Sequence, residues 1–266
     1  MSPVGGVRIA MLGTALLGLA VTAFVAARAD IPLDQRRSSY NDMSSDTKAM
    51  QDDDTSNPAM LSVLDGEALW NTRAGVSVKS CADCHGEARS SMKGVAARYP
   101  AFDETAGRAV NIEQRINLSR ERDQKAAPFR YESAELLALT AYIAMQSRGE
   151  PITPPEDVRL EPFRERGQAL FNQRIGQLNL SCAQCHDDNW GKSLAGNLIP
   201  QAHATGYPIY RLEWQSLGSL QRRLRNCMTG VRAEPYALGA IEYVELELFL
   251  MWRARGMTME SPGVRP

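Results

Sequence analysis

The chain has 266 residues, of which 44% are hydrophobic, and its 30 lysines and arginines nearly balance its 31 aspartates and glutamates. This balance excludes the strongly basic character typical of nucleic-acid binding, so no nucleic acid is expected as a partner. The length is sufficient for two small domains with separate hydrophobic cores. The chain contains five cysteines, and four of them occur in two closely spaced pairs.

Residues 1–29 have the pattern of a signal peptide. Arg8 precedes an apolar run over residues 9–26, and residues 27–29 (Ala-Arg-Ala) match the small-x-small rule for cleavage. We expect cleavage before Asp30 and a mature protein outside the cytoplasm, in the periplasm. An uncleaved membrane anchor is the alternative, because the apolar run is just long enough to cross a bilayer.

Residues 30–58 are polar and show no helical or strand periodicity, and they include an acidic run over residues 52–54. Such a composition predicts an extended N-terminal arm rather than part of a core. The arm could be a solvated tail or a strap across a partner subunit, and the sequence leaves both alternatives open.

The first domain is expected to span residues 59–150. A helix predicted over residues 66–75 leads into a CxxCH motif made by Cys81, Cys84 and His85. This motif is the signature of a c-type haem that two thioethers attach to the chain, with the histidine as an axial ligand. One covalently bound haem c is therefore expected here, with His85 on its iron.

Helical periodicity predicts that each half ends with a core helix. Residues 135–148 carry apolar side chains at helical spacing, residues 242–255 match them at an offset of 107, and a glycine follows both segments. Between the halves, residues 149–162 contain too many prolines for a helix and predict an extended linker. The second domain is expected to span residues 151–266.

The second half repeats the first at an offset of 101 residues. Residues 167–176 match residues 66–75, and a second CxxCH motif consists of Cys182, Cys185 and His186. A second covalently bound haem c is expected here, with His186 as its axial ligand. The repeat indicates an internal duplication. The fold expected is all-α, with two cytochrome c-like domains, the N-terminal arm and the proline-rich linker.

Cys227 is the fifth cysteine and belongs to neither motif. Residues 220–227 align with residues 112–119 at an offset of 108, so Cys227 corresponds to Ser119 of the first half. It follows His186 by 41 residues, which is enough chain to pass round a porphyrin and present a sixth ligand. A thiolate would bind ferric iron strongly and lower the potential of the haem.

Arg223 lies four residues before Cys227 and, in a helix, one turn away from it. Its guanidinium could stabilise the thiolate and hold a small oxyanion through paired hydrogen bonds. Arg253 is a second candidate for anion binding, because its counterpart in the first half is the neutral Gln146. Two further arginines are assigned to haem propionates or to a solvated face: Arg222 and Arg225.

With these residues in view, the chain resembles the SoxA family, the dihaem subunits of thiosulfate-oxidising SoxAX cytochromes. The similarity covers nearly the whole mature chain, and CxxCH alone would be generic. The specific stretches are residues 182–191, 210–214, 220–227 and 251–256.

The resemblance implies an activity and a set of partners. A SoxA-like chain forms a heterodimer with a SoxX-like monohaem cytochrome c and oxidatively couples thiosulfate to a cysteine of a SoxYZ-like carrier protein, an L-cysteine S-thiosulfotransferase reaction. The family's cysteine haem ligand, which is found as a persulfide, corresponds to Cys227, and its substrate-binding arginine corresponds to Arg223. The electrons would pass through the haems to a soluble cytochrome c acceptor.

Ser119 stands where relatives that ligate the first haem through sulfur have cysteine, and a serine hydroxyl is a poor ligand for iron. We therefore expect the first haem to have another sixth ligand, a water molecule or an open position. Met92, Met145 and Met228 are conceivable thioether ligands, although methionines more often pack in cores. His203 has no counterpart in the first half, and a structural role in a loop is expected for it.

Two other functions remain open from the sequence. A thiosulfate dehydrogenase that forms tetrathionate also uses a cysteine-ligated haem, and product analysis without a carrier protein separates it from the transferase. A dihaem electron-transfer cytochrome without catalysis is the second alternative, in which Cys227 only sets the haem potential. A dihaem peroxidase fits less well, because a thiolate opposite His186 would occupy the position on iron that peroxide needs.

Overall fold

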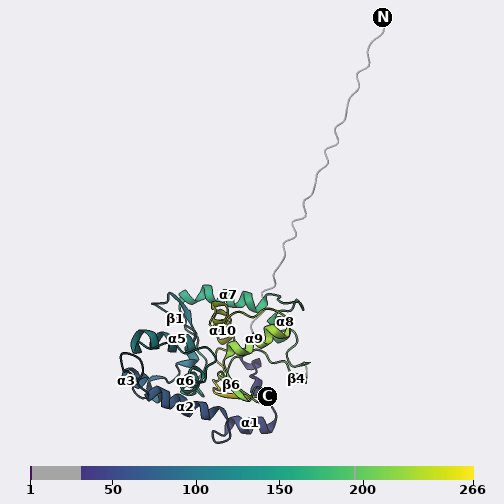
Figure 1. Ribbon diagram of the computed structural model, residues 1–266. Coiled ribbons are helices and arrows are strands. Elements are labelled where there is room, and N and C mark those ends of the chain that lie inside the picture. Colours follow the sequence, from purple (N-terminus) through teal and green to yellow (C-terminus); the bar gives the residue numbers. More distant parts are fainter. Residues whose placement is uncertain (2–30, 195) are drawn as a thin grey trace. The chain divides into compact units, whose positions relative to one another are not determined.

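The computed structural model describes residues 31–194 and 196–266, together with Met1 (Figure 1). The predicted signal peptide therefore lies outside the described residues. Ile31–Pro266 form one compact unit. Among the described residues, no helix combines the length and the apolar character needed to cross a membrane.

Two pairs of long helices form the frame of this unit. Helix α2 (Ala59–Asn71) packs along α6 (Ala134–Met145), and α7 (Glu161–Asn172) packs along α10 (Ile241–Arg253). The second helix of each pair is the more deeply buried, as the apolar periodicity of its sequence predicts. The two predicted core helices are therefore confirmed, and each closes its half against the helix that precedes the CxxCH motif.

A glycine lies at the closest approach of each helix pair. A Cβ atom on Gly66 would stand 2.2 Å from the carbonyl oxygen of Ala138, and one on Gly167 would stand 2.0 Å from that of Glu245. Only a residue without a side chain allows backbones to approach this closely. These glycines align in the two halves, so the sequence repeat has a matching contact in the fold.

Shorter helices complete each half around these pairs. The CxxCH motifs form α3 (Cys81–His85) and α8 (Cys182–His186), while α5 (Ile112–Ser119) and α9 (Leu220–Gly230) occupy corresponding places later in each half. The predicted helix that carries Cys227 is thus confirmed. The remaining short turns are α4 (Ala88–Ser91), the 3-10 turns Ala96–Arg98 and Val158–Leu160, and the π turn Arg120–Gln124.

The expectation of an all-α fold was wrong in one respect, because the described residues include three small sheets. Strand β1 pairs with β2 and β3 with β4, both antiparallel, and β5 lies between antiparallel β6 and parallel β7. Each strand has only two or three residues, too few to show alternation in the sequence. The strands are β1 (Ala101–Asp103), β2 (Arg108–Val110), β3 (Ser193–Leu194), β4 (Asn197–Leu198), β5 (Ile209–Arg211), β6 (Ser216–Gly218) and β7 (Gly263–Arg265).

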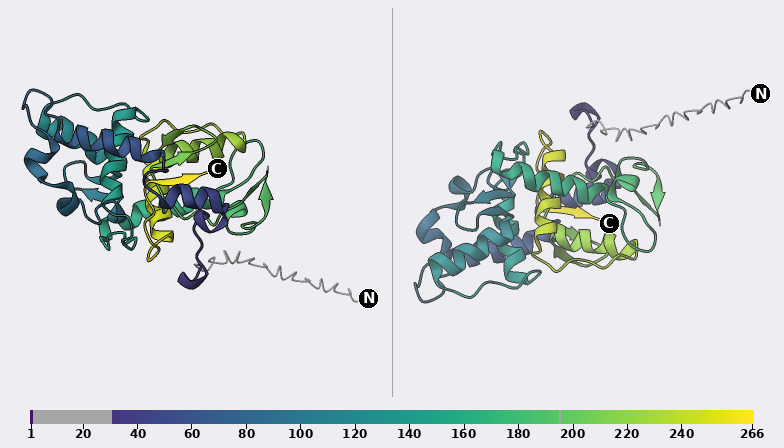
Figure 2. Two further views of the ribbon diagram at one scale, coloured as in Figure 1. Left: turned by 90° about the horizontal axis from the view of Figure 1, so that it is seen from below. Right: turned by 90° about the horizontal axis from the view of Figure 1, so that it is seen from above.

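The N-terminal segment also differs from the extended arm that its polar composition predicted. It contains α1 (Ser45–Asp52) and the 3-10 turns Leu33–Gln35 and Ser39–Asp42. The side chain of Gln51 accepts a hydrogen bond from the backbone nitrogen of Val264 (2.9 Å), so the segment is fixed to β7 of its own chain. Figure 2 shows this purple segment beside the yellow C-terminal strand.

The linker is extended as predicted over most of its length. Residues 152–157 have no regular structure, and Ile152 exchanges backbone hydrogen bonds with Met257 and Gly256. Pro162 was assigned to the linker but lies in the first turn of α7. Proline is tolerated there because the first residues of a helix have no intrahelical acceptor for their N–H groups.

Candidate haem sites and the Cys227 helix

The two CxxCH helices begin with the same side-chain arrangement. The Ser80 hydroxyl accepts a hydrogen bond from the backbone of Asp83 (3.0 Å), whose carboxylate accepts one from the backbone of Ser80 (2.9 Å). Ser181 and Gln184 form the same capping box at α8. Capping boxes stabilise helices too short to persist alone. They hold each pair of cysteines and the following histidine on one turn.

A cavity of about 300 Å³ in the first half is lined by all three motif residues, Cys81, Cys84 and His85. Ser119 and Met92 line the same cavity. Its walls are largely apolar and include Trp70, Ile112, Ile116, Leu139 and Ile143. Two thiols, an imidazole and an apolar slot fit a covalently attached haem c.

Aromatic rings back both motif histidines from equivalent positions. The ring centroid of Trp70 lies 5.7 Å from that of His85, and its Nε1 donates to the carbonyl of Gly86 (3.0 Å). Phe171 occupies the same place in the second half, with its centroid 6.5 Å from that of His186. Trp70 and Phe171 each lie four residues, about one helical turn, after the glycine at the helix crossing. The packing of the helices therefore determines where each ring lies.

His186 is oriented for metal ligation. Its Nδ1 lies 2.7 Å from the carbonyl oxygen of Pro200, so Nδ1 carries the proton that it donates and Nε2 is free to bind iron. Burial lowers the pKa of His186, the hydrogen bond to Pro200 partly opposes this, and the nearby charges of Arg223 and Arg253 lower it further. The neutral imidazole is the form that ligates iron.

Cys227 lies on α9 and is half-buried. Burial raises the pKa of the Cys182 thiol to about 12, and the charge of a Cys227 thiolate is the second cause. The same two causes raise the pKa of Cys185. The charge of Cys227 therefore acts on both motif thiols, as expected for a sixth ligand to the second haem.

The charge of Arg223 affects other residues of the second half. Its charge lowers the pKa of His186, and it opposes the rise that burial causes in the pKa of Tyr207. Within residues 31–194 and 196–266, no carboxylate lies within ion-pair distance of Arg223. A guanidinium next to Cys227 thus keeps its donors available.

The first half differs at this point. Arg115, the counterpart of Arg223, donates from Nη1 to Asp103 (2.8 Å), and Arg122 pairs with the same carboxylate (3.0 Å). The hydrogen bond from Arg122 is the main reason that the pKa of Asp103 is far below its usual value. The first half therefore has a neutralised arginine and a serine where the second half has an unpaired arginine and a cysteine.

The anion-binding role predicted for Arg253 stays a prediction, and the structure shows its protein contacts. It is 7% exposed, its Nε donates to the carbonyl of Gln201 (3.2 Å), and its Nη2 forms an ion pair with Asp187. Its guanidinium lies over Phe171, 5.2 Å from the ring centroid. These contacts hold Arg253 beside Asp187, the residue that follows His186.

His203 has a structural contact of the kind expected. Its Nδ1 lies 2.9 Å from the carbonyl oxygen of Arg37, so it connects the N-terminal segment to the second half. Met228 packs in the core of the second half, and the hydroxyl of Tyr243 lies 3.5 Å from its sulfur. Of the three candidate thioethers, only Met92 lines the first cavity among the described residues.

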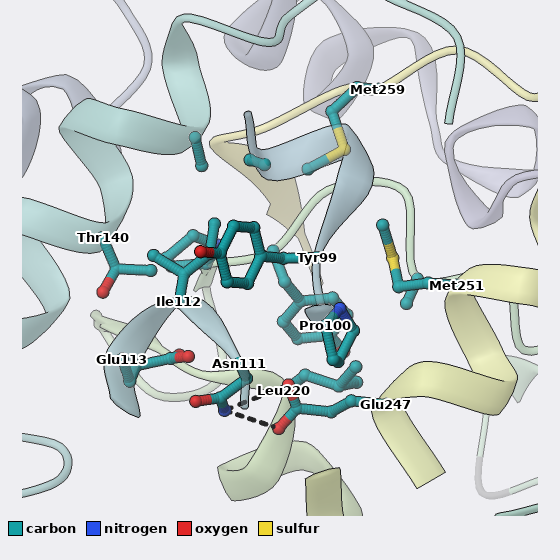
Figure 3. Close-up of a pocket in the computed structure, with 15 residues that line it drawn as sticks. Tyr99, Pro100, Asn111, Ile112, Glu113, Thr140, Leu220, Glu247, Met251 and Met259 are labelled. Atoms are coloured by element: carbon teal, nitrogen blue, oxygen red, sulfur yellow. Dashed lines mark hydrogen bonds between the residues drawn. The ribbon is translucent and has the colours of Figure 1, made fainter. Parts of the chain in front are cut away.

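Sequence reasoning missed two features of the site. Tyr207 is buried and feels the charges of both Arg223 and Cys227, and no spacing pattern predicted it. A small cavity between the halves contains Glu113 and Glu247, and Asn111 donates to both oxygens of Glu247 (3.1 Å each; Figure 3). Buried glutamates on helices resemble surface charges in the sequence, so only the fold shows them.

The comparisons with known proteins agree with this geometry. A family sequence model described as the SoxA/TsdA cytochrome c domain matches residues 65–152 and again residues 166–259. The L-cysteine S-thiosulfotransferase subunit SoxA of Pseudaminobacter salicylatoxidans is 38% identical over 88% of this chain and 82% of its own length. The protein of the same name from Rhodovulum sulfidophilum is 35% identical over 87% of this chain and 81% of its own length.

A solved structure is also similar. The crystal structure of SoxXA from P. pantotrophus contains a chain that matches with a TM-score of 0.83 and 31% sequence identity, over 87% of both chains. Together with the two matches of the cytochrome c domain model, this indicates two cytochrome c domains, one in each half.

Proposed function

The chain belongs to the SoxA/TsdA cytochrome c family, and we propose that it is the SoxA-type subunit of an L-cysteine S-thiosulfotransferase. The observation that carries this proposal is the difference between the halves. Only the second half combines a cysteine at the end of the aligned helix segment, Cys227, with an arginine that no carboxylate neutralises within the described residues, Arg223. A thiosulfate-coupling site needs both a sulfur nucleophile and an anion-binding cation.

The reaction joins two sulfur atoms and releases two electrons. A carrier thiol, R–SH, and thiosulfate, S₂O₃²⁻, give R–S–S–SO₃⁻, one proton and two electrons. One S–S bond forms, the S–H bond breaks, and the electrons reduce two equivalents of a ferric cytochrome c acceptor. Haem c, when bound, supplies a one-electron acceptor beside the sulfur chemistry.

The residues of the chain have separate roles in this proposal. Cys81 and Cys84 would attach the first haem, Cys182 and Cys185 would attach the second, and both motif histidines would bind iron. Nε2 of His186 and the sulfur of Cys227 would together hold the iron of the second haem. Arg223 attracts the substrate dianion.

The proposal includes partners and a location. The matched structure is titled as a SoxXA complex, which supports a SoxX-like monohaem cytochrome c as heterodimer partner. A SoxYZ-like carrier supplies the acceptor cysteine, and a soluble cytochrome c takes up the electrons. The leader sequence supports export to the periplasm, where covalent haem attachment in bacteria takes place.

The repeat in the sequence supports an origin of the two halves by internal duplication. We propose a first domain over residues 59–150 and a second over residues 151–266, with residues 30–58 as an N-terminal segment that joins the second. The hydrogen bond between Gln51 and Val264 supports this attachment.

The test is the intact mass of a SoxYZ-type carrier after incubation with this protein, its monohaem partner, thiosulfate and ferricytochrome c. A thiosulfonate adduct on the carrier cysteine is expected with wild type, and Cys227→Ala should abolish it. Tetrathionate formed without a carrier, and no adduct with one, would instead establish a thiosulfate dehydrogenase. Cytochrome reduction that persists in Cys227→Ala would favour a simple electron carrier.

A further inference from the structure

The strand hairpins that precede α5 and α9 are equivalent elements of the two halves. Strand β1 pairs with β2 in the same register as β5 with β6, at a constant offset of 108 residues. Asp103 ends β1 and Arg211 ends β5, so an acid in the first half corresponds to an arginine in the second. The same offset relates Arg115 to Arg223.

This exchange reverses the electrostatics of one contact. In the first half Asp103, which is almost fully buried, accepts a hydrogen bond from Arg115. By the same alignment, Arg211 takes the place of that acid opposite Arg223 in the second half. Two guanidinium groups have only donors and cannot bond to each other, so the pair is complementary to an anion between them.

Arg211 has a donor available for that anion. Its side chain is 11% exposed, and its Nη2 donates to Glu213 (2.8 Å), a carboxylate that is itself 54% exposed. Its Nε is buried and, in the part of the chain that the structure describes, has no acceptor. A buried N–H without an acceptor is unfavourable, so a ligand that accepts from it is expected.

The surroundings connect Arg211 with the site on α9. The ring of Trp214 packs near two guanidinium groups, that of Arg211, 5.3 Å from the centroid, and that of Arg222, 4.3 Å from it, which connects the hairpin with the first turn of α9. Burial lowers the pKa of Arg211, and the charge of Arg223 is the second cause. The charges of Arg223, Cys227 and Arg211 all act on the pKa of Tyr207, so Tyr207 lies within electrostatic range of each.

We propose that Arg211 and Arg223 together bind the sulfonate oxygens of thiosulfate beside Cys227, an inference that rests on the function proposed above. The sulfonate has three oxygens, which two guanidinium groups can hold from two sides. Its terminal sulfur is then directed to Cys227. Arg211 is therefore a substrate-binding residue that selects for a doubly charged oxyanion.

A haem propionate offers the same chemistry as a sulfonate and is the competing occupant. The two differ in their consequences. An arginine that binds substrate affects the KM for thiosulfate and leaves the haem unchanged, whereas an arginine that neutralises a propionate shifts the haem midpoint potential and leaves substrate affinity unchanged.

The experiment compares Arg211→Gln, Arg211→Lys and the control Arg174→Gln in the haem-loaded complex with its monohaem partner. Arg174 is an exposed arginine of the second half, so its removal changes the net charge equally without touching the proposed site. The readouts are the KM for thiosulfate, the dissociation constant of thiosulfate for the oxidised complex by calorimetry, and the midpoint potentials of the haems.

We expect Arg211→Gln to raise the KM and the dissociation constant about 10- to 100-fold, since a charge-assisted hydrogen bond is lost. Arg211→Lys should give an intermediate value, and the control should stay near wild type. Unchanged affinity with a shifted potential would assign Arg211 to a propionate and overturn the proposal, as would equal effects in the control. Because calorimetry measures binding without turnover, failure of carrier transfer in wild type would reject the proposed function and leave this test intact.

Discussion

The contact at Gly167 allows a quantitative test of how helix packing supports the second haem site. In Gly167→Ala the new Cβ would lie 2.0 Å from the carbonyl oxygen of Glu245 and 3.0 Å from the Cβ of Phe249. A backbone oxygen cannot rotate away, so α7 and α10 must separate. Overpacking of this kind is unfavourable by about 1–3 kcal/mol, and the better helix propensity of alanine returns about 1 kcal/mol.

We therefore expect Gly167→Ala to lower the free energy of unfolding by about 1 kcal/mol, or to lower Tm by about 2–4 °C for a chain of this size. Separation of α7 and α10 also moves Phe171, which backs His186. The assay is denaturant unfolding of the haem-loaded protein by circular dichroism, combined with electron paramagnetic resonance of the ferric haems. The signal of the second haem should broaden.

Gly230→Ala is the matched control. Gly230 is a helical glycine too, the last residue of α9, but a Cβ there would meet no atom within 4 Å. We expect it to leave stability unchanged or to raise it by up to about 1 kcal/mol. If Gly167→Ala unfolds at the same denaturant concentration as Gly230→Ala, close backbone approach does not limit the packing of this half, and the reasoning is refuted.

Three further predictions concern charges and ligands. Burial raises the carboxyl pKa of Glu247 to about 8 and that of Glu113 to about 7, so folding favours their protonated forms. The contribution of this pair to stability should be largest below pH ~4.5 and be lost as pH rises to ~8, and Glu247→Gln should flatten this contribution in urea titrations. Arg253→Gln removes the ion pair with Asp187 and should lower stability by about 3 kcal/mol in the same titrations, with an altered ferric spectrum of the second haem. Ser119→Cys places a thiol in the cavity that contains the first motif, so it should add a second thiolate-ligated low-spin signal; an unchanged spectrum would mean that position 119 does not face the iron.

Much of the frame could be predicted from the sequence. The two motif helices, the two closing helices and the Cys227 helix each combine a long apolar pattern or a fixed motif with a repeat in the other half, and these signals are independent of tertiary context. The first turn of α7 was assigned to the linker because proline usually ends a helix, yet at a helix N-terminus it is favourable.

The errors have physical causes. The N-terminal segment is polar, but Gln51 and Asn57 use that polarity to bond the backbone of Val264 and Pro262, so composition alone predicted a solvated arm. The ion pair between Arg253 and Asp187 was not predicted, because the two residues are 66 positions apart in sequence. Pairings at such a distance leave no periodic signal.

Alignment of the helices identified only part of the proposed site, because Arg211, which corresponds to Asp103 of the first half, lies on a strand. The helical repeat identified Arg223 and Cys227, which lie on one element, whereas Arg211 lies on a three-residue strand that carries no pattern of its own.

When the two strand hairpins are aligned, the halves differ at two positions around the corresponding arginines, Arg115 and Arg223. Asp103, which pairs with Arg115, is replaced by Arg211, and Ser119 is replaced by Cys227. Either change alone would be ineffective, because a thiolate without an anion site cannot hold thiosulfate, and an anion site without a sulfur has nothing to couple to it. Under the function proposed above, the same scaffold supports a haem site in one half and a sulfur-coupling site in the other.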